Sequence, residues 1–220
     1  MKLTIFAATG GIGRLVVEQA VSAGHDVTAV SRKPLQLDDV NSVQADLGSP
    51  DLAALVTAVE GADAVLSALG PRSKSEYGIA SKGTRAIIEA MGAAGVRRAV
   101  VVSAAPVGTV PSPGRAHPPK HDPGDGFAMR YFMGPAIKAM IKSHYLDLAI
   151  MEDELRASTL QWTIIRPPKL TNKARATNYR TMLDQNVCGG LSVSRADVAQ
   201  EMLRVLTQSN TIGHTVGIAN

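Results

Sequence analysis

Apolar runs of strand length alternate along the chain with segments of helical periodicity. The first run, residues 3–8, is nearly continuous, which predicts a strand buried on both faces. Apolar residues then recur at helical spacing from Ile12 to Ala23, and Gly24 supplies a C-terminal stop. The chain therefore begins with a strand, a glycine-containing turn and a helix.

The same alternation continues to the end of the chain. Further strands are predicted at 26–31, 43–45, 63–68, 98–103, 162–166 and 215–219, and further helices at 51–60, 76–94 and 194–208. Right-handed crossovers between parallel strands place helices on both faces of a sheet. The pattern predicts an α/β fold, a Rossmann-type doubly wound parallel sheet in three layers. A length of 220 residues favours a single domain, 1–220.

One segment breaks the alternation. Residues 106–126 read "PVGTVPSPGRAHPPKHDPGDG", which is too rich in Pro and Gly for a helix or a central strand. Long loops inside a compact domain are usually functional or disordered. We predict a mobile flap over the C-terminal edge of the sheet, with small substrate-side elements at 127–155 and 167–190. His117, Lys120 and His121 lie in the flap and are more often solvated than catalytic at such positions.

Composition narrows the classes of partner. The net charge of +4 and the pI near 9.3 come from scattered Lys and Arg, and the chain has only four Tyr, three Phe and one Trp. This is a thin supply for a base-stacking surface, so no nucleic acid is expected, and the excess charge suits phosphates of a small molecule. The single cysteine, Cys188, excludes an intrachain disulfide, and no metal site is expected.

The chain shows no targeting or membrane signal. The apolar run before Gly10 is too short for a signal peptide, and no segment approaches the ~18 apolar residues of a membrane span. We expect a cytoplasmic protein with a small-molecule substrate and no membrane partner. Both a monomer and a homodimer stay open.

The turn after the first strand reads Ala7-Ala8-Thr9-Gly10-Gly11-Ile12-Gly13. A dinucleotide-binding turn needs a glycine where the backbone approaches the pyrophosphate and another where helix packs on strand, and Gly10 and Gly13 take these places. Alanine stands where the first glycine is usual. If the strand continues through Ala7 with ordinary β angles, the extra methyl group costs little. We therefore predict cofactor binding by Thr9, Gly10, Gly11, Ile12 and Gly13.

The second predicted strand ends in Ser31-Arg32-Lys33. An Asp or Glu at this place would hold the unmodified ribose of NAD. A hydroxyl group and two cations instead suit a 2′-phosphate. These three residues predict NADP (NADPH) rather than NAD, although exposed Arg-Lys pairs are also common without a ligand.

Several segments together resemble a known family. They are "IFAATGGIGRLVV", "SRK", "ADL", "DAVLSALGPR", "GTRAIIEAMGAAGVRRAVVVSA", "LRASTLQWTIIRPPKLTN" and "SRADVAQEML". They are similar to the atypical short-chain dehydrogenase/reductase group with an NAD(P)H-binding domain, which includes NmrA-like regulators and biliverdin/flavin reductases. The resemblance covers most of the chain.

The resemblance implies further cofactor-binding residues at the C-terminal ends of the strands. It places Asp46 and Leu47 at the adenine, and Ser67, Ala68, Leu69 and Gly70 along the ribose and pyrophosphate. It also places Ser103 and Ala104 beside the nicotinamide and Pro167 on the far wall of that site.

Catalytic machinery is sparse. The best-known members of the superfamily use a Ser, and a Tyr followed four residues later by Lys, whose charge lowers the pKa of the phenol. Here Tyr145 is followed by Ala149, and Lys142 is only a loose substitute on the same helix. Ser103 and Tyr145 are the catalytic candidates.

Three functions remain open at this point. The first is an NADPH-binding oxidoreductase that reduces a small flavin, quinone or carbonyl-type acceptor by hydride transfer, which needs no dedicated acid. The second is a non-catalytic, NADP-binding redox sensor resembling NmrA. The third is a sugar-nucleotide epimerase-like enzyme, for which the Tyr/Lys pair is missing.

Overall fold

The computed structural model describes residues 1–33, 39–125, 142–175 and 178–220. Its large sheet contains β1 (Lys2–Phe6), β2 (Asp26–Ser31), β3 (Val40–Gln44), β4 (Ala64–Ser67), β5 (Arg98–Val102), β6 (Gln161–Arg166), β8 (Arg180–Leu183) and β10 (His214–Ala219). The short strands β7 (Lys169–Thr171) and β9 (Ser192–Ser194) form a separate parallel pair. The α-helices are α1 (Gly13–Ser22), α2 (Leu52–Val59), α3 (Ile79–Ala94), α5 (Lys142–Ala157) and α6 (Arg195–Arg204).

The strand order confirms the predicted Rossmann-type fold. The sheet runs β3-β2-β1-β4-β5-β6-β10-β8, and every pairing from β3 through β10 is parallel. Only β8, at one edge, is antiparallel to its neighbour. The chain reverses its direction of winding between β1 and β4, so the ends of these two strands open onto the crevice where ligands bind in this architecture.

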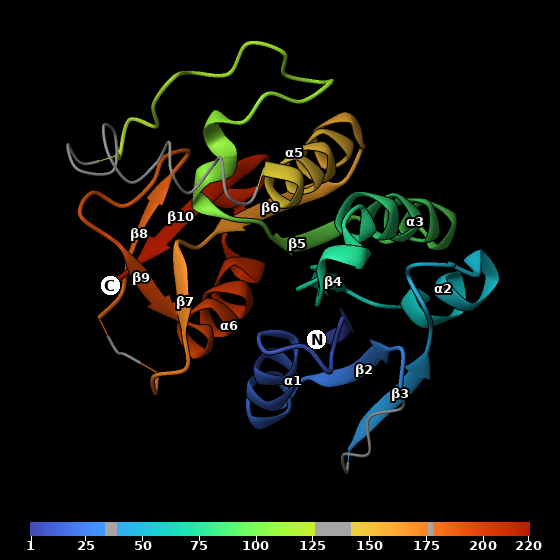
Figure 1. Ribbon diagram of the computed structural model, residues 1–220. Helices are drawn as coiled ribbons and strands as arrows, with labels where there is room; N and C mark the ends of the chain where they lie inside the picture. The colour runs from blue at the N-terminus through green and yellow to red at the C-terminus, as the bar shows by residue number, and fades with distance from the viewer. Residues whose placement is uncertain (34–38, 126–141, 176–177) are drawn as a thin grey trace.

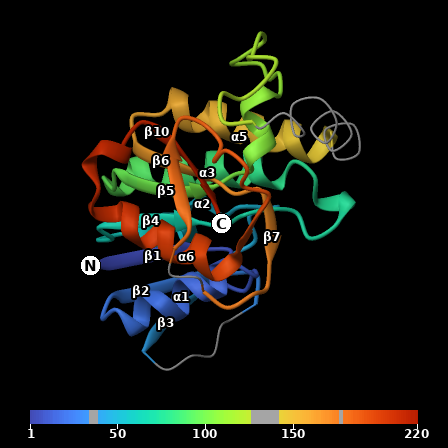
Figure 2. The same cartoon turned by 90° about the vertical axis from the view of Figure 1, so that its left-hand side faces the viewer.

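Two helical layers enclose the sheet (Figures 1 and 2). Helices α1 and α6 pack together on one face, and α2, α3 and α5 cover the other. Alternate residues of β1 serve the two layers: Leu3 and Ile5 join the core beneath α1 and α6, whereas Phe6 joins the core beneath α2 and α3. This two-sided burial explains why the first strand reads as a continuous apolar run.

Some predicted boundaries were wrong by a few residues. The third strand is Val40–Gln44 rather than 43–45, because it lies at the sheet edge, where its mostly exposed residues carry no apolar run. Helix α3 begins at Ile79 rather than 76, after a left-handed Gly78 with φ 95°. Helix α6 ends at Arg204, and a 3₁₀ turn covers Val205–Thr207. The short strands β7, β8 and β9 were not predicted.

A buried carboxylate from α5 caps the start of α3. Asp147 accepts backbone hydrogen bonds from Gly78 at 3.0 Å, Ala80 at 3.1 Å and Ser81 at 3.0 Å, and the Ser81 hydroxyl group donates to it at 2.6 Å. Its side chain thereby satisfies amide groups that have no partner inside a helix. The cap fixes α3 against α5.

The Pro- and Gly-rich loop is tied down at two places. The Gly114 amide donates to Asp153 on α5 at 2.9 Å, and Asp122 accepts from the Asn186 amide at 2.7 Å. Both views place this loop at the α5 and β10 end of the molecule, away from α1, β2 and β3. The described part of the predicted flap is thus anchored. Residue 126 and the stretch predicted to follow it, to 141, lie outside the described residues.

Candidate active site

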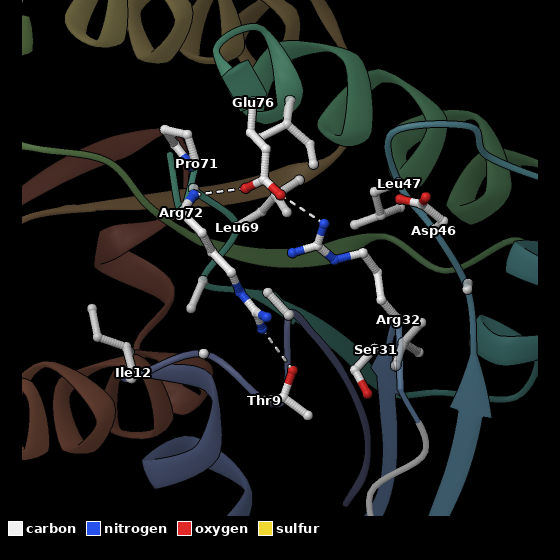
Figure 3. Close-up of a pocket in the computed structure, with 18 of the residues that line it drawn as sticks. Thr9, Ile12, Ser31, Arg32, Asp46, Leu47, Leu69, Pro71, Arg72 and Glu76 are labelled. Carbon is white, nitrogen blue, oxygen red and sulfur yellow. Dashed lines mark hydrogen bonds and ion pairs between the residues drawn. The ribbon is translucent and has the colours of Figure 1, made fainter. Parts of the chain in front are cut away.

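A cleft of about 340 Å³ opens at the C-terminal ends of β1, β2 and β4. Figure 3 shows polar side chains entering it from both sides. The residues that line it are Ala7, Thr9, Gly10, Gly11, Ile12, Val30, Ser31, Arg32, Ala45, Asp46, Leu47, Ala68, Leu69, Gly70, Pro71, Arg72, Glu76, Ile79, Leu170 and Arg195. Eleven of the predicted cofactor-binding residues are in this set.

The floor of the cleft is the glycine turn between β1 and α1. Ala7 does not continue the strand: its φ is 57°, in the left-handed region, which corrects the expectation of ordinary β angles. Its carbonyl group accepts a hydrogen bond from the Gly10 amide at 2.8 Å. A Cβ atom on Gly13 would lie 2.2 Å from that carbonyl oxygen, so the close approach of α1 to the turn requires glycine at this position. The alanine is accommodated at a cost in backbone strain of about 1 kcal/mol.

The N-terminus of α1 is open toward the turn. No side chain caps it, and its first turn contains no acidic residue. The positive end of the helix dipole therefore remains available to an anion above the glycines.

Two arginines flank the turn. Arg72, which follows β4, donates to the Thr9 hydroxyl group at 2.9 Å across the cleft. Arg195, the first residue of α6, donates to Asn172 at 2.6 Å. Its side chain lies over Gly11, where an added Cβ would be 3.0 Å from the Arg195 Cδ atom. A phosphate group above the turn would thus meet a cation on each side.

The third cationic group of the cleft comes from the end of β2. Arg32 donates to Glu76 at 2.6 Å, and the Arg72 amide donates to the other carboxylate oxygen at 2.7 Å. The backbone hydrogen bond from Arg72 and the bond from Arg32 hold the pKa of Glu76 below its usual value, so the group is a carboxylate at neutral pH.

The far end of the cleft beyond β2 is suited to a flat base. Leu47 is buried and lines the wall together with Ile79, while Asp46 accepts a hydrogen bond from the Gly48 amide at 2.9 Å. Ser31, also buried, lines the cleft next to Arg32. The adenine position that the resemblance implied for Asp46 and Leu47 is therefore on the cleft wall.

Some predicted site residues do not line the cleft. Gly13 packs against the backbone of Ala7, and Lys33 is exposed. The Ser67 hydroxyl group is buried without a hydrogen-bond partner in the described part of the chain. The Pro167 carbonyl group accepts from the Ala105 amide at 2.9 Å, which joins the ends of β5 and β6. Ala104 packs against the core beneath α5.

Ser103, a catalytic candidate, is engaged in a buried ion cluster. Its hydroxyl group donates to Glu152 at 2.7 Å, and Glu152 is fully buried. The same carboxylate accepts from Arg166 at 2.9 and 2.5 Å and from Arg156 at 2.7 Å. Burial raises the pKa of Glu152, but the bonds and charges of the two arginines outweigh it and lower the pKa overall. The Ser103 hydroxyl group thus points into the core.

Tyr145, the other catalytic candidate, is also buried. It packs in the core beneath α5 with Ala149, the residue that replaces the usual lysine. Burial raises the pKa of Tyr145, which is the opposite of what a lysine partner would do. The side chain of Lys142 lies outside the described part of the structure.

Sequence reasoning missed Arg72, Glu76, Leu170 and Arg195. Arg72 and Arg195 stood in two of the quoted segments, "DAVLSALGPR" and "SRADVAQEML". Arg72 lies in the loop five residues after the end of β4, and Arg195 begins α6. An arginine in the loop after a predicted strand and another at a predicted helix start were the available signals. Glu76 and Leu170 carried no such signal, since only the folded chain brings them to the cleft.

The site fits a dinucleotide. Gly10 and Gly11 line the cleft at the turn without side chains, and cations stand at both the turn and the end of β2. In the residues that the structure describes, no group of three His, Cys, Asp or Glu side chains could hold a metal ion. Within the same ranges, no helix has the length and apolar content to cross a membrane.

Fold and cleft together define a dinucleotide-binding protein of the Rossmann type. The chain belongs to the NAD(P)H-binding family, whose family model matches residues 7–209.

Individual proteins are similar over nearly the whole chain. The uncharacterized sugar epimerase YhfK of Bacillus subtilis is 29% identical over 96% of this chain and 90% of its own. A short-chain dehydrogenase/reductase from Veillonella parvula, solved in complex with NADP, shares 18% identity with a TM-score of 0.78, covering 100% and 94% of the two chains. An anaerobillin reductase from Escherichia coli O157:H7 shares 21% identity with a TM-score of 0.71, covering 99% and 97%.

Proposed function

We propose that the protein is an NADPH-dependent oxidoreductase that reduces a small flavin, quinone or carbonyl-type acceptor by hydride transfer. The observation that carries the proposal is the placement of three arginines along one cleft. Arg32 lies at the end of β2, where a 2′-phosphate would sit, and Arg72 and Arg195 flank the glycine turn, where the pyrophosphate would sit.

The acceptor end is proposed at Leu170 and Arg195. Both residues line the cleft, Arg195 lies over Gly11 of the glycine turn, and Leu170 is half-buried. An apolar wall with one cation suits a planar, electron-accepting ring. One similar structure is described as an anaerobillin reductase, which supports this class.

The chain's own residues act by binding and orientation. When bound, the reduced nicotinamide supplies the hydride. Arg72, Arg195 and the first turn of α1 hold the phosphates, so the cofactor has one orientation in the cleft. Ala149 occupies the position four residues after Tyr145, so no lysine ammonium group at that position can make Tyr145 a proton donor.

Cofactor binding tests the proposal first. Titration with NADPH, followed by nicotinamide fluorescence and thermal unfolding, should show saturable binding. The absence of a fluorescence change and of a thermal shift at millimolar NADPH would refute the proposal. Turnover comes next: loss of NADPH absorbance is followed with flavins, quinones and small carbonyl compounds.

Arg32→Ala should weaken NADPH binding about tenfold and leave NADH binding nearly unchanged, because only NADPH carries the phosphate that Arg32 would bind. Dissociation constants for both cofactors measure the effect. Arg85→Ala is the matched control, since it removes a guanidinium from an exposed ion pair with Glu154 outside the cleft. Equal losses for the two cofactors would contradict an NADPH preference set by Arg32.

Tyr145→Phe should reduce NADPH-dependent turnover less than tenfold, because general-acid catalysis normally contributes at least about a hundredfold and a buried phenol with a raised pKa is a poor donor. Steady-state turnover with the best acceptor measures this. A loss of about a hundredfold or more, without loss of NADPH affinity, would make Tyr145 the proton donor.

Two other functions have distinct outcomes in these experiments. NADPH binding without oxidation by any acceptor would favour a redox sensor. The similarity to a protein named as a sugar epimerase favours the third candidate, an epimerase-like enzyme. Interconversion of a sugar nucleotide, with tightly held cofactor and no net NADPH oxidation, would support it.

A further inference from the structure

Glu76 stands across the cleft from the predicted 2′-phosphate site. It ends the 3₁₀ helix Lys74–Glu76, after β4, and its side chain is 22% exposed. Figure 3 shows its carboxylate pointing between the Arg32 guanidinium and the main chain of Arg72. The ion pair with Arg32 thus joins the two sides of the cleft.

We propose that Glu76, together with Arg32, sets the choice between NADPH and NADH. Its carboxylate accepts hydrogen bonds from the adenosine ribose of NADH, and it competes with the 2′-phosphate of NADPH for Arg32. This inference rests on the proposed function, since it concerns the same cofactor cleft.

The chemistry of the carboxylate and the guanidinium supports these roles for Glu76 and Arg32. A carboxylate that faces a ribose accepts hydrogen bonds from its hydroxyl groups, which is how an acidic residue at the end of β2 usually selects NAD. The end of β2 here carries Ser31 and Arg32 instead. Glu76 supplies the missing carboxylate from another element, on the opposite side of the cleft.

The carboxylate is held in place independently of Arg32. The Arg72 amide donates to its second oxygen at 2.7 Å, whereas the Arg72 guanidinium is turned away to Thr9. When a 2′-phosphate binds Arg32, the hydrogen bond from the Arg72 amide keeps Glu76 near that phosphate. Repulsion between these two anions then lowers the affinity for NADPH below what Arg32 alone would give.

The second acidic residue on the cleft wall, Asp46, does not share this role. Its Oδ1 atom accepts from the Gly48 amide, two residues on, in a local turn. Among the described residues, Glu76 is the carboxylate for which the structure gives an ion pair with Arg32.

Glu76→Gln tests the proposal through the dissociation constants of NADPH and NADH. We expect NADPH to bind about fivefold more tightly and NADH about fivefold more weakly, so that their ratio changes by about twenty-fivefold. Glu76→Ala, which removes the carboxylate without adding an amide, should move the ratio in the same direction. Glu18→Gln is the matched control, because Glu18 pairs with Arg14 on the exposed surface of α1.

The outcomes separate this inference from the proposed function. If wild-type protein binds both cofactors and neither variant changes their ratio, the role of Glu76 is overturned and the proposed function stands. If NADPH binds more weakly to both variants, Glu76 only positions Arg32, and the proposal is also overturned. If wild-type protein binds neither cofactor, both proposals fall together.

Discussion

Glu152→Gln is expected to lower the free energy of unfolding by about 3–5 kcal/mol, because it leaves a buried arginine without its counter-charge. Glu152 is fully buried, and the Arg166 side chain beside it is only 6% exposed. Glutamine keeps the shape of the side chain and removes its charge. Urea unfolding at neutral pH measures the change. The pKa of Glu152 is lowered in the folded chain. Its contribution to the free energy of unfolding is therefore complete at neutral pH and is lost as the pH falls through that pKa.

The same substitution at Glu154 is the control. Glu154 lies on the same helix but pairs with Arg85, whose side chain is 64% exposed, so Glu154→Gln should cost less than about 1 kcal/mol. Equal losses of unfolding free energy for the two variants would mean that the buried charge cluster does not hold α5 to β6.

Ser103→Ala should lower the free energy of unfolding by about 1–2 kcal/mol and leave turnover nearly unchanged, because its hydroxyl group bonds to the buried cluster.

Gly13→Ala is expected to lower the free energy of unfolding by about 2–3 kcal/mol, because backbone atoms occupy the place of the new methyl group. The methyl carbon would lie 2.2 Å from the Ala7 oxygen and 2.9 Å from the Ala7 carbonyl carbon. Moving the helix away from the turn also displaces the phosphate cradle. NADPH binding should weaken at least about thirtyfold.

Gly92→Ala provides the contrast. Gly92 lies inside α3, and an added Cβ there meets nothing within 4 Å. This change should raise stability by about 0.5–1 kcal/mol, through the higher helix propensity of alanine, and leave NADPH binding unaltered. If Gly13→Ala behaves like Gly92→Ala, the close approach of helix and turn does not limit the site.

The fold was accessible from the sequence because its signals are local. Apolar runs and helical spacing set the order of the buried elements, and β1, β2, β4, β5 and β6 all lie within the sheet interior. The edge strands β3 and β8 have mostly exposed side chains, so their patterns are weaker. The left-handed conformation of Ala7 could not be inferred, since alanine rarely adopts it.

The candidate site was predictable where residues adjoin a strand end. Thr9, Gly10 and Arg32 follow β1 and β2 and reach the cleft as expected. Glu76 reaches it only through the path of the chain after β4. The environment of Ser103 was equally hidden, because Glu152 and Arg156 have the spacing of an ordinary exposed helical ion pair, yet Glu152 is buried against β6.

The cap that α5 provides for α3 has a consequence for synthesis of the chain. Asp147 lies 69 residues after Gly78 and 66 after Ser81, and it accepts hydrogen bonds from the backbone amides of both. When α3 leaves the ribosome, its first turn has no cap, because the carboxylate has yet to be made. The adenine end, with Ile79 in its wall, is therefore completed only after α5 has docked. A nascent chain that stops short of residue 147 would carry every predicted cofactor-binding residue except Pro167, but without a finished cleft.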